Sequence, residues 1–174
     1  MSPPLHIETS RLQLRWLEPD DAHFILDLVN DPAWLRFIGD RQVSSLSDAR
    51  AYIENGPQVM YRETGHGLNR VALHDGDIPI GICGLLQRES LAHSDLGFAL
   101  LPDYRGHGYA FEAAISVVQH GFEELGKKRI VAIVNASNRA SISLLKRVGF
   151  QRQETLKPEP NGAALDLYSI NRET

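Results

Sequence analysis

The sequence predicts one α/β domain that spans residues 1–174, and three observations support this prediction. First, several segments alternate apolar and polar residues as half-buried strands do, and others place apolar residues at helical spacing. Second, residues 95–114 run in the order strand, glycine-containing turn and helix. Third, no internal repeat, low-complexity tract or linker divides the chain, which is long enough to bury one sizeable core.

The N-terminal part of the chain predicts a strand, a helix and a short apolar segment. Residues 9–17 alternate leucine and tryptophan with arginine and glutamine, which is typical of a half-buried strand. Pro19-Asp20-Asp21 begins a helix with acids in its first turn, where the helix dipole favours negative charge. Asp31-Pro32 interrupts that helix before the apolar segment 33–38.

The next part of the chain predicts a further helix and a β-hairpin. Ser45-Leu46-Ser47-Asp48 resembles a capping box, and Gly56-Pro57 is expected to kink or split the helix that this box begins. Strands are expected at about 68–74 and 78–87. Asp75-Gly76-Asp77 joins them, and an Asp-Gly pair between two strand-like runs is a strong signal for a hairpin.

The rest of the chain predicts further strands, each preceded or followed by a helix or a turn. The run 96–101 is an apolar strand, and beyond the turn apolar residues recur at helical spacing at Ala110, Ala113, Ala114, Val117 and Val118. The remaining expected elements are an interior strand at 128–134, a helix at 138–148 that ends at Gly149, a strand from Phe150 onward, a loop at 158–162 and a last strand at 163–170.

Composition and charge exclude several classes of protein. The net charge of −4 and the pI near 6.0 argue against a general nucleic-acid binder. The single cysteine, Cys83, lies in an apolar run, where we expect a buried hydrophobic residue, and its lack of a disulfide partner favours a reducing compartment. The first ten residues predict no signal peptide, and no apolar run approaches the length of a membrane span. We therefore expect a cytoplasmic protein with no membrane or direct nucleic-acid partner, and no residue cluster has the spacing of a metal site.

The turn Arg105-Gly106-His107-Gly108-Tyr109-Ala110 predicts a site for a phosphate or pyrophosphate group. A helix that begins at such a turn points several unpaired backbone N–H groups at one spot, and glycine lets a phosphate approach the backbone. The turn lacks the Lys-Ser/Thr of a Walker A loop and the third glycine of a Rossmann fingerprint. Taken alone, two glycines one residue apart are also compatible with a tight connection between strand and helix.

A second string of residues opens the late helix. It reads Asn138-x-x-Ser141-x-x-Leu144-Leu145-x-x-x-Gly149-Phe150. Taken alone, this string is also compatible with ordinary helix punctuation, in which asparagine caps the first turn and glycine ends the last one. The combination of this string with the glycine-containing turn, separated by one helix and one strand, is far more specific than either part.

The combination resembles the GNAT superfamily of N-acetyltransferases. In that family an Arg/Gln-x-x-Gly-x-Gly/Ala loop, matched here by Arg105-x-x-Gly108-x-Ala110, holds the pyrophosphate of acetyl-CoA. Asn138 and Ser141 match residues that approach the pantetheine arm and the thioester sulfur. The chain is most similar to the RimJ/RimL branch, which acetylates the N-terminal amines of ribosomal proteins, through Thr9-x-Arg11-Leu12-x-Leu14-Arg15 and the loop residues 101–113.

This resemblance implies a mixed, mostly antiparallel sheet with a central splayed strand pair and helices on both faces. The strand before the loop is expected to lose its pairing with the next strand, so that its free backbone groups hold the thioester arm. His107 is expected to use its backbone N–H, with its ring in solvent. The implied cofactor-binding residues are Phe98, Ala99, Leu100, Arg105, Gly106, His107, Gly108, Tyr109, Ala110, Asn138 and Ser141.

Two residues are candidates for catalysis. Many members of the family carry a tyrosine that protonates the leaving thiolate, but this position is Leu145 here, so Ser141 is the expected proton donor. Asp95, at the start of the central strand, is the candidate general base, although a residue at such a position is more often a solvated turn residue. Glu112 is expected to serve only the helix dipole, and Phe111 replaces a small hydroxyl residue on the adenine side of the groove.

The implied function is acetyl transfer from acetyl-CoA to a primary amine, and the expected acceptor is the α-amine of a protein or peptide N-terminus. An α-amine has a pKa near 8, so a fair fraction is neutral without a strong base. A polyamine, an amino acid, an aminoglycoside and a non-catalytic acyl-CoA-binding module are the alternatives. We expect residues 34–39, residues 52–64 and the last hairpin to form the acceptor pocket. The negative net charge favours a cationic amine as the acceptor. We expect the protein to be a monomer or a homodimer.

Overall fold

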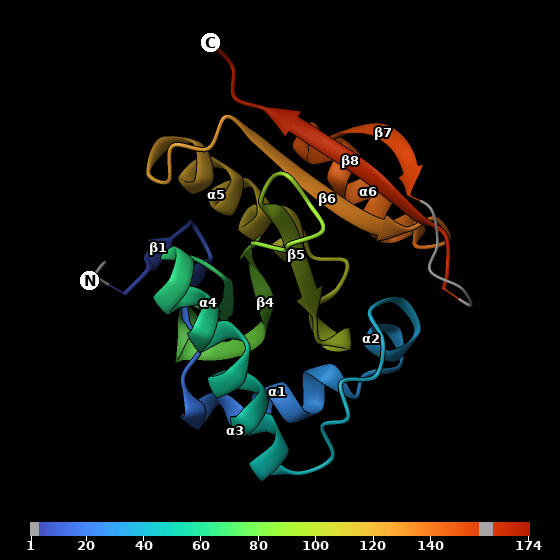
Figure 1. The fold of residues 1–174 in the computed structure, drawn as a ribbon. Coiled ribbons are helices and arrows are strands. Elements are labelled where there is room, and N and C mark those ends of the chain that lie inside the picture. The colour runs from blue at the N-terminus through green and yellow to red at the C-terminus, as the bar shows by residue number, and fades with distance from the viewer. Residues whose placement is uncertain (1–3, 157–161) are drawn as a thin grey trace.

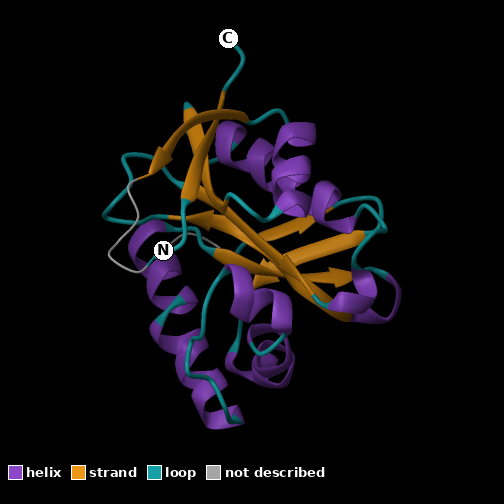
Figure 2. Cartoon of the chain, turned by 90° about the vertical axis from the view of Figure 1, so that its right-hand side faces the viewer, coloured by secondary structure: helices purple, strands orange, loops and turns teal. Residues whose placement is uncertain are grey.

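The computed structural model describes residues 4–156 and 162–174, which form one eight-stranded sheet with helices on both faces (Figures 1 and 2). The strands are β1 (His6–Glu8), β2 (Leu12–Trp16), β3 (Leu68–Leu73), β4 (Ile78–Leu86), β5 (Asp95–Leu100), β6 (Arg129–Asn135), β7 (Gln151–Leu156) and β8 (Leu165–Asn171). The helices are α1 (Ala22–Val29), α2 (Pro32–Phe37), α3 (Leu46–Asn55), α4 (Pro57–Thr64), α5 (Tyr109–Glu123) and α6 (Arg139–Val148).

The sheet is mixed, and its parallel strand pair lies near its centre. The strand order is β1-β2-β3-β4-β5-β6-β8-β7, and every neighbouring pair is antiparallel except β5 and β6. These two strands are in register only at Asp95 and Val131, and the Val131 N–H donates to the carbonyl of Ser94 at 3.0 Å. Beyond that point β5 pairs with β4 alone and β6 with β8 alone. The expected splayed strand pair is therefore confirmed, and it leaves a gap beside β5 up to Leu100.

Helices cover both faces because both faces of the sheet are apolar. On one face, α5 and α6 pack on a core that includes Leu14, Leu85 and Ile130 from the strands. The α5 residues in this core are those that helical spacing predicts, Ala113, Ala114, Val117 and Val118. On the other face, α1 and α3 form a second core that includes Ile25, Ile53 and Ile82. Cys83 is fully buried in the first core, as expected.

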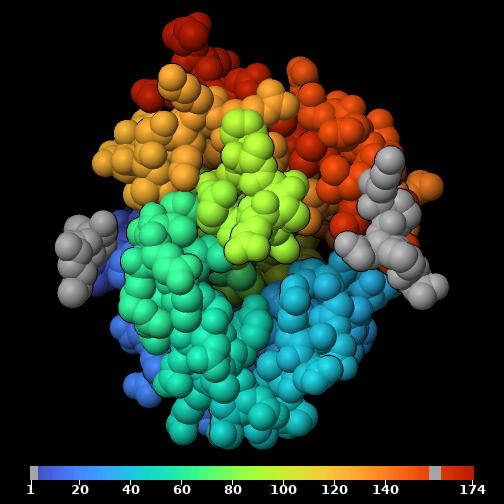
Figure 3. Space-filling model, in the orientation of Figure 1, coloured from blue at the N-terminus to red at the C-terminus, as the bar shows by residue number. Residues whose placement is uncertain are grey.

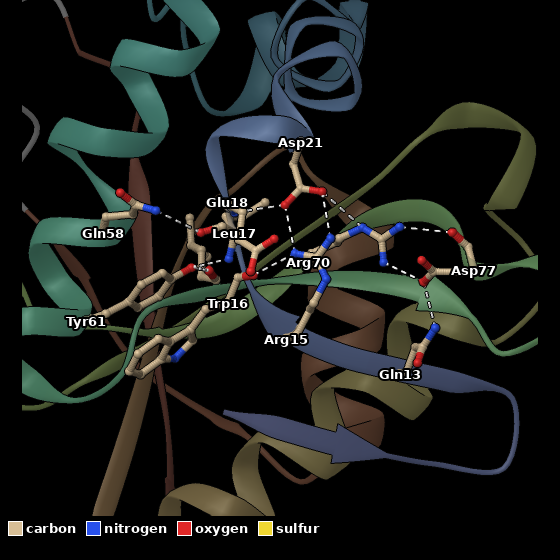
Figure 4. Close-up of polar contacts among 11 residues, drawn as sticks. Gln13, Arg15, Trp16, Leu17, Glu18, Asp21, Gln58, Tyr61, Arg70 and Asp77 are labelled. Atoms are coloured by element: carbon tan, nitrogen blue, oxygen red, sulfur yellow. Dashed lines mark hydrogen bonds and ion pairs between the residues drawn. The ribbon is translucent and has the colours of Figure 1, made fainter. Parts of the chain in front are cut away.

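An ion network fixes the N-terminal strands to the start of α1 (Figure 4). Asp21 accepts hydrogen bonds from both terminal nitrogens of Arg15, each 2.8 Å long. The side chain of Arg70 in β3 is only 6% exposed and lies between Asp21, at 3.3 Å, and Asp77, at 2.8 Å. The network therefore joins β2, β3, the beginning of α1 and the turn between β3 and β4.

Tyr61 fixes α4 against the same strands (Figure 4). Its hydroxyl donates to the carbonyl of Leu68 and accepts the N–H of Leu17 at 3.0 Å, and its ring stacks on Trp16. Burial raises the pKa of Tyr61, which keeps the hydroxyl protonated and able to donate. The inner side of α4 is consequently held against β2 and the start of β3.

Differences from the expected elements have local causes. No strand was expected at β1, and the strand expected at 9–17 is the shorter β2, because the Thr9 N–H donates to the carbonyl of Leu12 at 2.9 Å and closes a hairpin turn. Ser45 accepts the N–H of Asp48 as expected, but Asp48 accepts from Ser44, so the capping box is incomplete.

The remaining boundaries agree closely with the sequence-based expectations. Gly56-Pro57 splits the expected helix into α3 and α4. The late helix α6 has Asn138 as its N-cap and ends at Gly149, which adopts a left-handed conformation with φ of 114°. Of the loop expected at 158–162, all but the last residue lies outside the described residues.

Candidate active site

A cavity of about 1020 Å³ occupies the gap where β5 and β6 separate. Its walls come from α2, α3, α4, the loop between β4 and β5, the turn before α5, and the start of α6. In Figure 3 a hollow lies between the residues of α2, those of α4 and the loop before β5. The volume is at the upper end of the range for small-molecule sites, so the cavity has room for a large ligand and a second reactant.

The glycine-containing turn forms one side of this cavity. Gly106 and Gly108 have φ of 78° and 80°, a left-handed conformation that residues with a Cβ rarely adopt. Gly108 is the N-cap of α5, so the first N–H groups of the helix lack an acceptor in a preceding turn. Gly106, Gly108, Tyr109 and Ala110 line the cavity, whereas the exposed His107 does not. This geometry suits a phosphate held by backbone N–H groups at the positive end of the helix dipole.

The back of the same turn is held by contacts that we name the Arg11–Glu112 clamp. The Glu112 carboxylate accepts hydrogen bonds from the Thr9 hydroxyl (2.6 Å), the Arg11 N–H (2.8 Å) and the Arg11 Nε (2.7 Å). Arg11 also donates to the carbonyl of His107 at 3.0 Å and lies 4.5 Å from the centre of the Tyr109 ring. The expectation that Glu112 serves only the helix dipole is therefore wrong, because it joins the turn between β1 and β2 to the start of α5.

The charge state of the clamp follows from its hydrogen bonds. Burial by itself would raise the pKa of Glu112, but the donors of Thr9 and Arg11 outweigh burial and leave the pKa below its ordinary value of 4.5. Glu112 is therefore ionised at neutral pH, and its side chain is only 18% exposed. A carboxylate at this position also complements the positive end of α5.

Arg105 stabilises the end of β5 with its side chain. Its Nε and Nη2 donate to the carbonyl of Leu100 at 3.1 and 2.8 Å, and Nη2 also donates to Asp31 at 2.5 Å. Asp31 is the N-cap of α2, so this ion pair fixes α2 to the turn. Because its guanidinium is engaged in these contacts, Arg105 offers a phosphate its backbone more readily than its side chain.

The N-terminus of α6 faces the cavity from the β6 side. Asn138 caps the helix, and its Oδ1 accepts the N–H of Ser141 at 3.2 Å. Asn138 therefore has the capping function that the sequence alone allows. Both residues line the cavity, and in the described part of the chain the Ser141 hydroxyl has no hydrogen-bond partner, which leaves it able to contact a ligand. Leu145, one turn further on, is buried in the core.

Asp95 lies where β5 and β6 meet, at the closed end of the gap. Its side chain is 2% exposed, and the Nε of Arg88 donates to both carboxylate oxygens at 3.1 and 3.2 Å. Burial raises the pKa of Asp95, and the charge and hydrogen bonds of Arg88 only partly oppose this rise. Asp95 is therefore a buried ion-pair partner and not a solvated turn residue, and it lines the cavity.

The segments expected to form the acceptor pocket also line this cavity. Trp34, Phe37 and Ile38 contribute apolar surface from α2 and its C-terminal end, and Val59 and Met60 contribute it from α4. Polar side chains of the same wall are Arg41, Tyr52, Glu63 and Arg88. From the last hairpin, Leu165, the first residue of β8, lines the cavity. Phe98, Ala99 and Leu100 of β5 form the floor between these segments and the glycine-containing turn.

Comparison with known proteins decides the family. Residues 11–151 match the family model described as an acetyltransferase (GNAT) domain. This chain belongs to the GNAT acetyltransferase family. It is 31% identical over 170 residues to the N-acetyltransferase YoaA of Bacillus subtilis, itself uncharacterised, covering 94% of this chain and 95% of YoaA.

Solved structures agree with the GNAT assignment. An acetyltransferase from Agrobacterium tumefaciens has a TM-score of 0.81 and 26% identity, over 99% of this chain and 96% of that chain. RimL, named as a ribosomal L7/L12 α-N-protein acetyltransferase and solved in complex with coenzyme A, has a TM-score of 0.83 at 17% identity, over 96% and 98% of the two chains. At that identity RimL shows the shared fold alone.

Family membership makes this protein an acyltransferase that uses acetyl-CoA as its co-substrate. The gap beside β5 and the left-handed turn before α5 fit such a co-substrate, since both leave backbone groups facing the cavity. Within residues 4–156 and 162–174, no helix is long and apolar enough to cross a membrane. In the same residues, no three His, Cys, Asp or Glu side chains are grouped as metal ligands would be.

Several residues of the site were missed by sequence reasoning. Asp31 pairs with Arg105 across 74 residues, and Glu112 bonds to Arg11 across 101, so no local spacing signals either contact. Arg41 and Arg88 lie in loops without a motif. The arginine in Thr9-x-Arg11 was a signal, because it belongs to the string that resembles the RimJ/RimL branch, but its partner could not be inferred from it.

Proposed function

We propose that this GNAT enzyme acetylates the N-terminal α-amine of a protein or peptide in the cytoplasm. The observation that carries this proposal is that the described cavity offers only carboxylates, which are weak bases. Three carboxylates and no histidine line the described cavity, and two of them, Asp31 and Asp95, are each paired with an arginine. An α-amine, with a pKa near 8, is partly neutral at cellular pH, whereas a lysine amine near pKa 10.4 requires a strong base.

The reaction assigns each residue a separate task. When bound, acetyl-CoA supplies the activated acetyl group. The backbone N–H groups of Gly108, Tyr109 and Ala110 hold its pyrophosphate. The side of β5 at Phe98–Leu100 that β6 leaves unpaired holds its arm by backbone hydrogen bonds, apart from the Leu100 carbonyl, which accepts from Arg105. Orientation of the two reactants in one cavity then supplies a large part of the rate acceleration.

Two side chains handle the protons. Asp95, with its raised pKa, accepts a proton from the incoming ammonium, directly or through water. Ser141, which lines the cavity, gives a proton to the departing thiolate sulfur. The amine nitrogen forms its bond to the acetyl carbon as the bond from that carbon to sulfur breaks. The second proton that the nitrogen loses replaces the one that Ser141 gives to sulfur, so the amide and free CoA are the products.

Two further observations support a protein N-terminus. The fold is shared with RimL, a protein named for α-N-acetylation of ribosomal L7/L12. The wall formed by α2 and α4 is largely apolar and open, as a site for the first residues of a peptide would be. The buried, unpaired Cys83 agrees with a reducing compartment.

A pair of peptides tests this proposal. One has a free N-terminus and no lysine, and the other has a blocked N-terminus and one lysine in an otherwise identical sequence. Release of CoA thiol, followed continuously, reports turnover for each. We expect the first peptide to be acetylated with the larger kcat/KM. Equal or faster turnover of the lysine peptide contradicts the proposal, as does binding of acetyl-CoA without turnover of either peptide.

A further inference from the structure

Two arginine side chains with unpaired N–H donors in the described structure line the cavity where the acceptor amine is expected to bind. Four arginines line the cavity, namely Arg41, Arg88, Arg105 and Arg147. Arg105 is paired with Asp31, and Arg147 lies over the ring of Phe111, 4.6 Å from its centre. Arg41 and Arg88 remain, and both belong to the wall where the acceptor amine is expected.

Arg88 has donors to spare although it is paired. Only its Nε donates to Asp95, at 3.1 and 3.2 Å. In the part of the chain that the structure describes, its two terminal nitrogens have no hydrogen-bond partner, and its side chain is 40% exposed. A guanidinium whose terminal nitrogens are free presents the fork that matches a carboxylate with two parallel hydrogen bonds.

Arg41 and Tyr52 complete the group. Arg41 forms no ion pair within residues 4–156 and 162–174, and it lines the same cavity as Tyr52. Arg41, Arg88 and Tyr52 thus offer their donors to one cavity, and the positive charges of Arg41 and Arg88 oppose the rise that burial causes in the pKa of Tyr52. The exposed carboxylate of Glu63 lines the same cavity.

We propose that Arg41, Arg88 and Tyr52 form a subsite that binds a carboxylate of the acceptor, so that the enzyme prefers α-amines with an acidic group close by. This inference rests on the proposed function and narrows its substrate class. It differs from the expectation drawn from the net charge of −4, because the side chains that line the described cavity carry a net positive charge.

The charge balance indicates a carboxylate and not a phosphate. Four arginines and three carboxylates, Asp31, Glu63 and Asp95, line the described cavity, which leaves a net charge of about +1 that a singly charged group neutralises and a doubly charged phosphate exceeds. The carboxylate can come from an acidic side chain in the first two residues of a peptide or from a free amino acid. Both sources place a carboxylate a few bonds from the reacting amine.

Matched peptides test the subsite. Glutamate at position one or two is compared with glutamine at the same position, and free glutamine and its α-amide form a second arm. One charge-assisted hydrogen-bonded pair is expected to raise kcat/KM for the acidic member by about tenfold. A larger acid-to-amide ratio for peptides than for free amino acids assigns the carboxylate to a peptide, and the reverse result assigns it to a small molecule.

Arg41 is the residue to change, because substitution of Arg88 would also disturb Asp95. We expect Arg41→Gln to bring the acid-to-amide ratio close to one and Arg41→Lys to restore part of it. Arg36→Gln, which removes the same charge from a neighbouring residue outside the cavity lining, should leave the ratio unchanged. A ratio of one in the unaltered enzyme, with both peptides acetylated, overturns the subsite alone, whereas acetylation of neither peptide overturns the proposed function.

Discussion

Removal of the Glu112 carboxylate should weaken CoA binding although Glu112 does not line the cavity. In Glu112→Ala, the Thr9 hydroxyl and two donors of Arg11 lose hydrogen bonds of 2.6, 2.8 and 2.7 Å. Arg11 in turn loses the partner that holds it against the carbonyl of His107 and the ring of Tyr109. The turn that carries the left-handed Gly106 and Gly108 then has no support from behind.

The expected magnitude follows from these contacts. Hydrogen bonds to charged groups contribute about 1.5–3 kcal/mol when buried, and partial exposure of Arg11 reduces this to about 1 kcal/mol each, so unfolding should become easier by about 2–3 kcal/mol. Ordering the backbone of one residue costs about 1–2 kcal/mol, so a loosened turn that must be ordered on binding should weaken CoA affinity about 5- to 30-fold. The value of kcat at saturating acetyl-CoA should change little.

Calorimetric titration with CoA, combined with thermal unfolding, measures both effects. Glu112→Gln keeps one acceptor oxygen and should give an intermediate result. Glu123→Ala removes the same charge from the exposed end of α5 and should leave CoA affinity unchanged. A folded Glu112→Ala protein with unaltered CoA affinity would refute the positioning function of the clamp.

The pH dependence of stability provides a second test of the clamp. Because the pKa of Glu112 is lowered in the folded protein, its contribution is fully present above the ordinary value of 4.5 and is lost as the pH falls through the lowered pKa. The difference in unfolding free energy between the unaltered protein and Glu112→Ala should therefore shrink below pH 4.5. A difference that stays constant down to low pH would show that ionised Glu112 contributes nothing.

The other predictions concern the turn and the two catalytic candidates. Gly108→Val forces a β-branched residue to adopt a φ of 80°, so a folded variant should bind CoA far more weakly, and unchanged binding by titration would remove the turn from the site. Ser141→Ala should lower the single-turnover rate by about a hundredfold with nearly unchanged CoA affinity, and an effect below about threefold would assign the proton to water. Since the pKa of Asp95 is raised, kcat should fall with decreasing pH at a value above the ordinary 3.8 of aspartate. Asp95→Asn should abolish that fall, and a fall that persists would rule Asp95 out as the base.

Patterns among neighbouring residues in the sequence were sufficient to predict much of the fold and part of the candidate site. Apolar spacing placed α5, Gly56-Pro57 marked the split between α3 and α4, and Asp-Gly marked the β3–β4 hairpin, because each of these features depends on neighbours in sequence. The turn at Gly106 and Gly108 could be predicted for the same reason, because a left-handed backbone conformation before a helix favours glycine, and glycine is visible in the sequence.

Other features depend on groups that meet only in three dimensions. The pairing of Arg105 with Asp31 and that of Arg11 with Glu112 join segments far apart in the chain, so a plausible local explanation, the helix dipole, concealed the function of Glu112. Asp95 likewise follows a loop, which suggests solvent, yet the meeting of β5 and β6 buries it. Local pattern carries no information on such burial.

The identity of the acceptor amine is tested most directly by one peptide that contains both an N-terminal α-amine and a lysine amine. A peptide with a free N-terminal amine and one lysine is incubated with the enzyme and acetyl-CoA under conditions of limited turnover, and tandem mass spectrometry locates the acetyl group. Competition within one molecule removes differences in peptide binding and concentration. We predict that the acetyl group is found on the N-terminal nitrogen. Acetylation mainly on the lysine side chain would contradict the assignment of this enzyme to α-amines.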